Sequence, residues 1–205
     1  MKVRTLVVGP IQENCYLVED AGELIVVDPG DEPERILAAV GQRAVRCIVC
    51  THYHWDHVGA VAALQEATGA GLALGALDAP QLDGVSSMEG RDIAQGHEPA
   101  HVTRLLHGGD VVQVGQAAFA VIDTPGHTPG GICLHCAAQG LLIAGDTLFS
   151  GGSFGRTDFA DGDFSALVAS ISGKLSQLPD ATRVLCGHGS PTTIGAERRL
   201  NPFLR

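Results

Sequence analysis

Three histidines and one aspartate lie close together in the segment Thr-His-Tyr-His-Trp-Asp-His at positions 51–57. The segment follows the apolar run 47–50, which is typical of a β-strand. Alternate residues of an extended chain point the same way, so His52 and His54 can bind one metal ion together. Asp56 and His57 come on the turn that follows and would face a neighbouring position. Zinc and similar ions favour this combination of imidazole and carboxylate groups.

Three further candidate ligands follow strand-like runs later in the chain. His127 lies in Thr-Pro-Gly-His-Thr-Pro-Gly-Gly, Asp146 comes directly after the apolar run 141–145, and His188 lies in Cys-Gly-His-Gly. Each is flanked by Gly or Pro, which fix unusual backbone angles. Seven ligand-type side chains at four strand ends predict a metal centre, and argue against a polar loop in which histidines gather by chance.

The composition favours one globular domain over residues 1–205 and excludes several classes of function. The chain is 45% hydrophobic and 18% charged, with a net charge of −10, which argues against binding to nucleic acid or to an anionic membrane surface. The first apolar run stops at Pro10, too early for a signal peptide, and no run approaches the length of a membrane span. We therefore expect a cytoplasmic protein.

Six cysteines include two Cys-x-x-Cys pairs, at positions 47 and 50 and at positions 133 and 136. This spacing also occurs in structural zinc sites. However, residues three apart on a strand face opposite sides, and both pairs lie among Ile, Val and Leu. We therefore expect reduced and mostly buried thiols.

Alternating strand-like and helix-like segments predict a layered α/β fold. Asp31 and Asp163 are suited to cap the starts of helices, and Gly41 and Gly69 to end them. The expected strands are 3–8, 15–18, 23–27, 47–50, 111–114, 119–123, 131–136, 141–144 and 182–186, and the expected helices are 33–40, 58–68, 164–178 and 193–200.

The segment 75–109 shows no regular pattern and predicts a loop or partial lid beside the metal centre. We expect its histidines, His97, His101 and His107, to be solvated or locally hydrogen-bonded. Tyr53 and Trp55 alternate with the candidate ligands, and we expect them to serve in packing alone.

The pattern His-x-His-x-Asp-His, followed in order by His, Asp and His, resembles the metallo-β-lactamase superfamily over nearly the whole chain. Gly-Asp-Thr-Leu-Phe at 145–149, Gly-Arg-Thr-Asp-Phe at 155–159 and the ending 201–204 further resemble the short, single-domain glyoxalase II-like hydrolases. The resemblance implies a four-layer αββα sandwich with its site at one rim. It also implies two metal positions, with the following ligands: His52, His54 and His127 for the first, Asp56, His57 and His188 for the second, and Asp146 between the two.

The resemblance further implies two divalent ions, with zinc expected first and iron or manganese as alternatives. A hydroxide that bridges the ions would attack an activated acyl bond, with Asp56 and Asp146 as catalytic carboxylates. A thioester is the expected substrate, because a thiolate leaves without a strong general acid. Asp146 also argues against the antibiotic-hydrolysing branch, which lacks the bridging aspartate.

Two residues carry open alternatives at this point. Asp28 either bonds its own backbone in a turn or holds a ligand histidine by its other ring N–H. Arg156 matches the family position that binds the carboxylate of a thiol-bearing substrate. Alternatively, it pairs with one of the carboxylates at 158, 161 and 163.

Two departures leave recognition of glutathione open. Ser190 stands where full-length glyoxalase II has a tyrosine, and we expect no helical domain that clasps glutathione. The main alternative function is a persulfide dioxygenase, with one iron held by two histidines and an aspartate. A non-catalytic metal-binding module is a further alternative. We expect a small acyl-thioester as the partner, and a monomer or homodimer.

Overall fold

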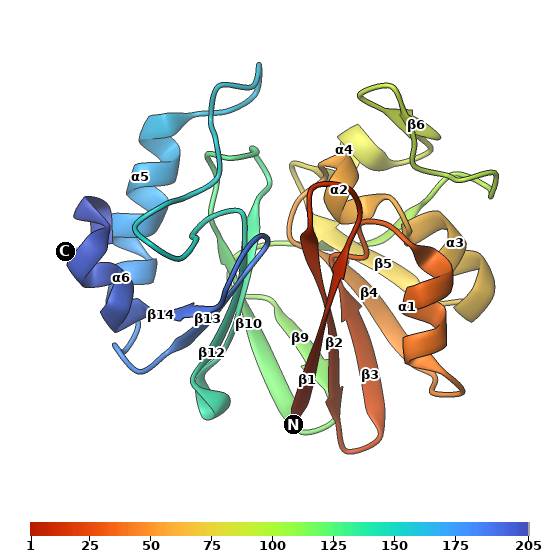
Figure 1. Cartoon of the computed structure of the whole chain (residues 1–205), viewed down its shortest axis with the longest axis horizontal. Helices are drawn as coiled ribbons and strands as arrows, with labels where there is room; N and C mark the ends of the chain where they lie inside the picture. The colour runs from red at the N-terminus through yellow and green to blue at the C-terminus, as the bar shows by residue number, and fades with distance from the viewer. Residues whose placement is uncertain (205) are drawn as a thin grey trace.

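A computed structural model describes residues 1–204 and contains two six-stranded sheets that pack face to face (Figure 1). The first sheet has the order β1 (Lys2–Val8), β2 (Glu13–Asp20), β3 (Glu23–Val27), β4 (Val45–Cys50), β5 (Gly71–Gly75) and β8 (Val102–Leu106). The second has the order β14 (Thr192–Thr193), β13 (Arg183–Cys186), β12 (Leu141–Gly145), β11 (Ile132–Cys136), β10 (Ala117–Asp123) and β9 (Val111–Val114).

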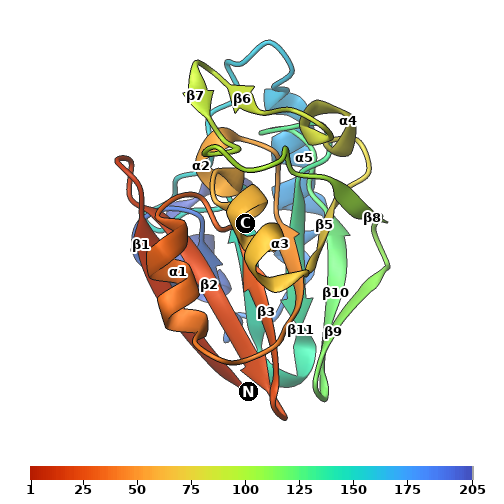
Figure 2. The ribbon, with the colours of Figure 1, turned by 90° about the vertical axis from the view of Figure 1, so that its right-hand side faces the viewer.

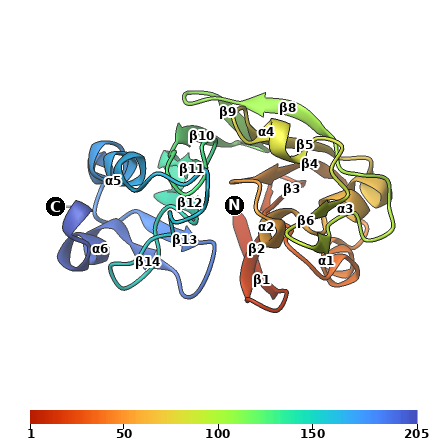
Figure 3. The same ribbon diagram turned by 90° about the horizontal axis from the view of Figure 1, so that it is seen from above.

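Helices cover the outer face of each sheet, which completes four layers (Figure 3). The first sheet carries α1 (Pro33–Val40) and α3 (Val61–Thr68), and the second carries α5 (Phe164–Gly173) and α6 (Ile194–Leu200). Short elements gather at one rim: α2 (Trp55–Val58), α4 (Ala79–Leu82) and the hairpin of β6 (Ser87–Met88) and β7 (Arg91–Asp92) (Figure 2). Three 3₁₀ turns are present at Ala137–Gln139, Leu175–Gln177 and Pro202–Leu204. The predicted αββα sandwich is confirmed.

Period-two alternation in the buried strands separates the core into layers. In β3, Leu24 and Val26 face the helices α1 and α3, whereas Ile25 and Val27 face the second sheet. Phe119 of β10 is fully buried in the layer between the two sheets. Each sheet is therefore apolar on both faces, which explains why its central strands are continuous hydrophobic runs.

The cysteines follow the same alternation. Cys50 lies in the layer under the helices, while Cys47 packs on the layer between the sheets. Cys133 and Cys136 likewise belong to different layers. All six cysteines are free, and all except the half-buried Cys47 are buried. The expectation that the thiols are mostly buried is thus confirmed.

Two predictions about helices are wrong. The single helix expected over 58–68 is broken at Gly59 and Ala60, because the chain there packs directly against another backbone segment. A Cβ on Gly59 would lie 2.2 Å from the Gly30 carbonyl oxygen, and the Ala60 N–H donates to the Pro29 carbonyl. Asp31 does not cap α1. Its side chain accepts from the Glu32 N–H, and Glu32 occupies the cap with a left-handed φ of 55°.

Two other boundaries also differ from the sequence-based expectation. The helix expected over 164–178 ends at Gly173, and a 3₁₀ turn follows it. The segment expected to be irregular, 75–109, contains α4, the β6–β7 hairpin and the edge strand β8. Because β8 exposes most of its side chains, it lacks the apolar alternation by which strands are recognised.

The helices in residues 1–204 are all too short or too polar to span a membrane.

Replacing Phe119 by Ala should lower the free energy of unfolding by about 3–5 kcal/mol, because it leaves a cavity between the two sheets. Phe164 is 49% exposed, so Phe164→Ala should cost less than about 1 kcal/mol. Urea unfolding of both variants measures the difference. Equal losses would show that the layer between the sheets is not tightly packed.

Candidate metal centre

The centre lies at the rim where strands of both sheets end. His52 and His54 follow β4, and α2 then carries Asp56 and His57. The loop between β10 and β11 carries His127, while Asp146 follows β12 and His188 follows β13. The structure thus brings all seven sequence-predicted candidates into one cluster. Five of them are buried, whereas Asp146 and His188 are partly exposed.

The first group consists of His52, His54 and His127, which each place one ring nitrogen within 4.8 Å of the others. The His54 Nδ1 and His127 Nε2 atoms are 2.9 Å apart. Burial lowers the pKa of His52 well below its usual value, and lowers that of His54 to about 4. Both imidazoles are therefore neutral near pH 7 and have a lone pair that can bind a cation.

The second group consists of Asp56, His57 and His188. The Asp56 Oδ2 atom lies 3.1 Å from the His188 Nε2 atom and 3.5 Å from the His57 Nε2 atom. Burial by itself raises the pKa of Asp56, but the adjacent His57 and His188 outweigh it and lower the pKa well below the usual value. This group therefore combines a carboxylate anion with two imidazoles.

Asp146 lies between the two groups. Its Oδ1 atom is 3.4 Å from the His57 Nε2 atom, and its Oδ2 atom is 3.5 Å from the His127 Nε2 atom. The Oδ2 atom also lies 3.8 Å from the His188 Nε2 atom, so the carboxylate as a whole contacts side chains of both groups. Burial raises its pKa, but neighbouring histidines, His57 first, lower it below the usual value, so the group is an anion.

The donor atoms fit divalent cations. The His52 Nε2, His57 Nε2 and Asp146 Oδ1 atoms are buried and have no hydrogen-bond partner within residues 1–204. Buried polar atoms are nearly always bonded to something. Several buried ligand-type atoms that lie close together and lack hydrogen-bond partners are typical of a metal site.

A model of the family described as the metallo-beta-lactamase superfamily matches residues 8–188, which include all seven side chains. The chain belongs to the metallo-β-lactamase superfamily. A relative from Haemophilus influenzae named hydroxyacylglutathione hydrolase GloC is 34% identical over 213 residues, covering 100% of this chain and 98% of that protein.

Two solved structures show the same superfamily fold. The structure of the protein called BLEG-1 B3 metallo-beta-lactamase has a TM-score of 0.88 and 36% identity, and the match covers 99% of both chains. The structure of TTHA1623 in a di-iron-bound form has a TM-score of 0.84 and 40% identity, and the match covers 98% of this chain and 100% of that chain.

Asp28 supports the superfamily motif from the end of β3. Its two carboxylate oxygens accept from the Thr51 N–H and hydroxyl at 2.6 and 2.8 Å. Its Oδ2 atom also lies 3.1 Å from the His57 Nδ1 atom, on the side of the ring away from Asp56. Asp28 therefore reaches across to the motif and does not bond its own backbone. Its φ of 50° is the left-handed conformation that allows this.

Asp78 is a supporting residue that the sequence analysis missed. It is fully buried beside α4 and accepts from the Thr128 hydroxyl at 2.7 Å and from the Gly130 N–H at 2.5 Å. These bonds hold the loop that carries His127. Burial raises the pKa of Asp78 to about 6, although hydrogen bonds, including one from the Tyr53 backbone, oppose the rise. Asp78 lies in the segment without a regular pattern, so no local signal indicates it.

Asn14 and Tyr16 of β2 hold the loop that carries His188, and sequence analysis missed them too. The Asn14 side chain donates to the Cys186 and Gly189 carbonyls at 3.0 and 2.9 Å. The Tyr16 hydroxyl donates to the same Cys186 carbonyl at 2.5 Å. The partners are more than 160 residues apart in sequence, so only the tertiary structure reveals them.

A cleft of about 360 Å³ opens directly over the centre. Arg156 lines it, with its guanidinium 4.5 Å from the centre of the Phe159 ring. The Phe159 ring packs at a tilted angle against the His54 ring. Arg156 also pairs with Asp158 through two bonds of 2.6 and 2.7 Å. The lining residues are Ile11, His54, Trp55, Asp56, Glu89, His127, Asp146, Phe149, Arg156, Phe159 and His188.

Other sequence-based expectations around the site have mixed outcomes. His97 and His101 pair locally with Glu66 and Asp83, as expected. Tyr53, expected only to pack, donates from its hydroxyl to the Asp161 carboxylate at 2.5 Å. This bond ties the histidine motif to the loop that carries Phe159, so packing is not its only contribution.

Replacing Asp78 by Asn should remove a pH dependence of stability. Between the unfolded pKa of 3.8 and the folded value of about 6, the folded protein keeps a proton that the unfolded chain loses. The free energy of unfolding should therefore fall, on the order of 2–3 kcal/mol, as the pH rises through this window.

Chemical unfolding of metal-free wild type and Asp78→Asn between pH 4 and 8 tests this. The difference between the two proteins should change up to about pH 6 and stay constant above it. A difference that does not vary with pH would contradict the buried, protonated state of Asp78.

Proposed function

We propose that this chain is a dinuclear metal-dependent hydrolase of acyl thioesters, of the glyoxalase II type. The observation that carries the proposal is the position of Asp146, whose carboxylate lies 3.4–3.8 Å from ring nitrogens of both groups of ligand-type side chains. A shared carboxylate of this kind suits two cations about 3.5–4 Å apart. The name of the Haemophilus relative supports a glutathione thioester, such as S-lactoylglutathione, as the substrate.

In this proposal His52, His54 and His127 hold one cation, Asp56, His57 and His188 hold the other, and Asp146 contacts both. Two divalent ions would supply Lewis acidity toward a carbonyl oxygen and lower the pKa of water to about 7, which provides hydroxide at neutral pH. Zinc suits this donor set. The di-iron form of the similar structure supports iron as the alternative.

The chain's own residues then bind and orient the thioester. Phe159 and Phe149 form apolar walls of the cleft beside the ligands. Asp158 occupies the Nε and Nη2 atoms of Arg156, which leaves the Nη1 atom to donate to a substrate carboxylate. We propose that Arg156, stacked on Phe159, holds the thiol carrier so that its acyl carbon lies over Asp146. Asp56 and Asp146 keep their anionic form and fix the charge of the centre.

Zinc-loaded protein should hydrolyse S-lactoylglutathione with a kcat/KM of ~10⁴ M⁻¹s⁻¹ or more, and metal-free protein should not. A β-lactam is the control substrate, because the BLEG-1 structure is called a B3 metallo-beta-lactamase. Turnover of the β-lactam alone would replace the thioesterase proposal. No turnover of either substrate would remove the thioester claim.

Asp146→Ala should remove one of the two metal ions and lower kcat by more than ~100-fold, because it deletes the carboxylate that faces both groups. Metal content of the purified variant is measured alongside the rate. Asp110→Ala is the matched control, since Asp110 bonds the His107 N–H outside the cleft. Two metals and unchanged turnover in Asp146→Ala would contradict the bridging role.

A persulfide dioxygenase is the second candidate, because the di-iron-bound form of a 40% identical structure shows that a similar protein binds iron. The two candidates differ in what they consume. Iron-loaded protein given glutathione persulfide should take up oxygen if it is a dioxygenase, with one iron per chain. Two metals per chain and no oxygen uptake would favour the hydrolase.

A further inference from the structure

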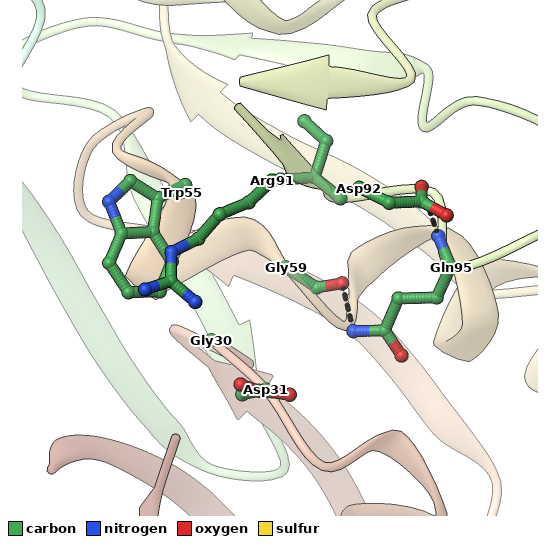
Figure 4. Close-up of a pocket in the computed structure, with 8 residues that line it drawn as sticks. Gly30, Asp31, Trp55, Gly59, Arg91, Asp92 and Gln95 are labelled. Carbon is green, nitrogen blue, oxygen red and sulfur yellow. Dashed lines mark hydrogen bonds between the residues drawn. The ribbon is translucent and has the colours of Figure 1, made fainter. Parts of the chain in front are cut away.

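A second hollow shares Trp55 with the metal cleft, and Figure 4 shows the residues that line this hollow. Its volume is about 230 Å³, below the roughly 300–1,000 Å³ that encloses a complete small-molecule ligand. The β6–β7 hairpin spans the two sites, because Glu89 lines the cleft and Arg91 lines the hollow. A ligand at the metals could therefore extend one end past Trp55 into the hollow.

Arg91 presents a cation in this hollow. Its guanidinium carbon lies 3.9 Å from the centre of the Trp55 ring, which holds the group in place by stacking (Figure 4). Within residues 1–204 it forms no ion pair, unlike Arg35, Arg43, Arg46, Arg156 and Arg198. A planar guanidinium with free N–H groups binds a carboxylate through two parallel hydrogen bonds. In a protein of net charge −10, such a fixed, unpaired cation favours an anionic ligand group.

Asp31 supplies the opposite charge at another side of the same hollow (Figure 4). Its Oδ1 atom accepts from the Glu32 N–H at 2.7 Å, which fixes the side chain and leaves the Oδ2 atom to accept from a ligand. Gln95 anchors the segment next to the hairpin, because its side chain donates to the Gly59 carbonyl at 2.7 Å. The hollow thus offers one cation, Arg91, and two carboxylates, Asp31 and Asp92. The segment after the hairpin is tied to the metal-binding helix region.

We infer that the hollow binds the α-amino-acid end of the thiol carrier, with its carboxylate on Arg91 and its ammonium on Asp31. A purely anionic group would be repelled by Asp31 and Asp92, and a purely cationic group by Arg91. A zwitterion satisfies both charges. The inference rests on the proposed function, since it concerns the carrier of the thioester hydrolysed at the metals.

Binding of S-methylglutathione, which has an α-amino-acid end and no hydrolysable thioester, tests the hollow by isothermal titration calorimetry on the zinc-loaded protein. Arg91→Met and Asp31→Asn should each weaken binding about tenfold, since each removes a charge-assisted contact. Arg199→Met is the matched control, because Arg199 is exposed on α6, away from the hollow, and also forms no ion pair within the described residues. It should bind like wild type.

A ligand without the ammonium isolates the contribution of Asp31. N-acetyl-S-methylglutathione keeps the carboxylate, so Arg91→Met should still weaken its binding about tenfold. Asp31→Asn should no longer weaken binding and should slightly strengthen it, because the ammonium that pairs with Asp31 is missing and Asp31 repels the remaining carboxylate. Equal binding of S-methylglutathione by Arg91→Met and wild type would overturn the inference. No binding to wild type would overturn it as well.

The outcome is separable from that of the proposed function. If the protein hydrolyses S-lactoylglutathione but binds S-methylglutathione without help from Arg91, the thioesterase stands and the hollow is not its carrier site. If the variants weaken binding as expected but no thioester is hydrolysed, the hollow stands and the reaction must be sought elsewhere.

Discussion

The rest of the structure depends on holding two buried carboxylates and several neutral imidazoles within a few ångströms of one another. Asp146 and His57 leave polar atoms unbonded in the interior, which costs free energy unless a cation binds them. The fold must therefore hold these polar side chains in the interior, although water would solvate them better. Backbone bonds between the two sheets do part of this, because the Ile132 N–H of β11 donates to the Thr51 carbonyl at the end of β4.

Each ligand loop has its own support, and each support comes from a distant part of the chain. Asp28 holds Thr51 beside the histidine motif, Asp78 holds the loop of His127, and Asn14 holds the loop of His188. Glycine allows the close approach of these loops. A Cβ on Gly187 would lie 2.1 Å from the Asp146 Oδ1 atom, and a Cβ on Gly30 would lie 1.6 Å from the Asp56 carbonyl oxygen. The centre is thus built by backbone packing as much as by ligand side chains.

The sequence predicts most strands of the two large sheets, their layered packing with helices and the seven clustered side chains, but it misses β5 and β8. The predicted features have short-range signals: apolar periodicity, strand ends, and Gly or Pro next to the ligand type. The supports lack such signals. The role of Asn14 depends on its hydrogen bonds to the distant Cys186 and Gly189 carbonyls. Asp78, which bonds Thr128, lies in a segment without a regular hydrophobic pattern. The break between α2 and α3 is likewise set by contact with Pro29 and Gly30. Tertiary packing decides these features, so a sequence read locally cannot show them.

The histidine motif also contacts the two arginines that we propose bind the substrate. Trp55, which lies between ligands of the two groups in sequence, packs against the Arg91 guanidinium. His54 packs at a tilted angle against Phe159, whose ring in turn contacts the Arg156 guanidinium. Both exposed guanidinium groups are therefore held on aromatic rings that contact or belong to the metal-binding segment. Each of these contacts holds a cation next to a ring at the metal-binding rim. In a protein with an excess of acidic residues, the two guanidinium groups place positive charge at this rim, and the proposed binding of an anionic thioester depends on that charge.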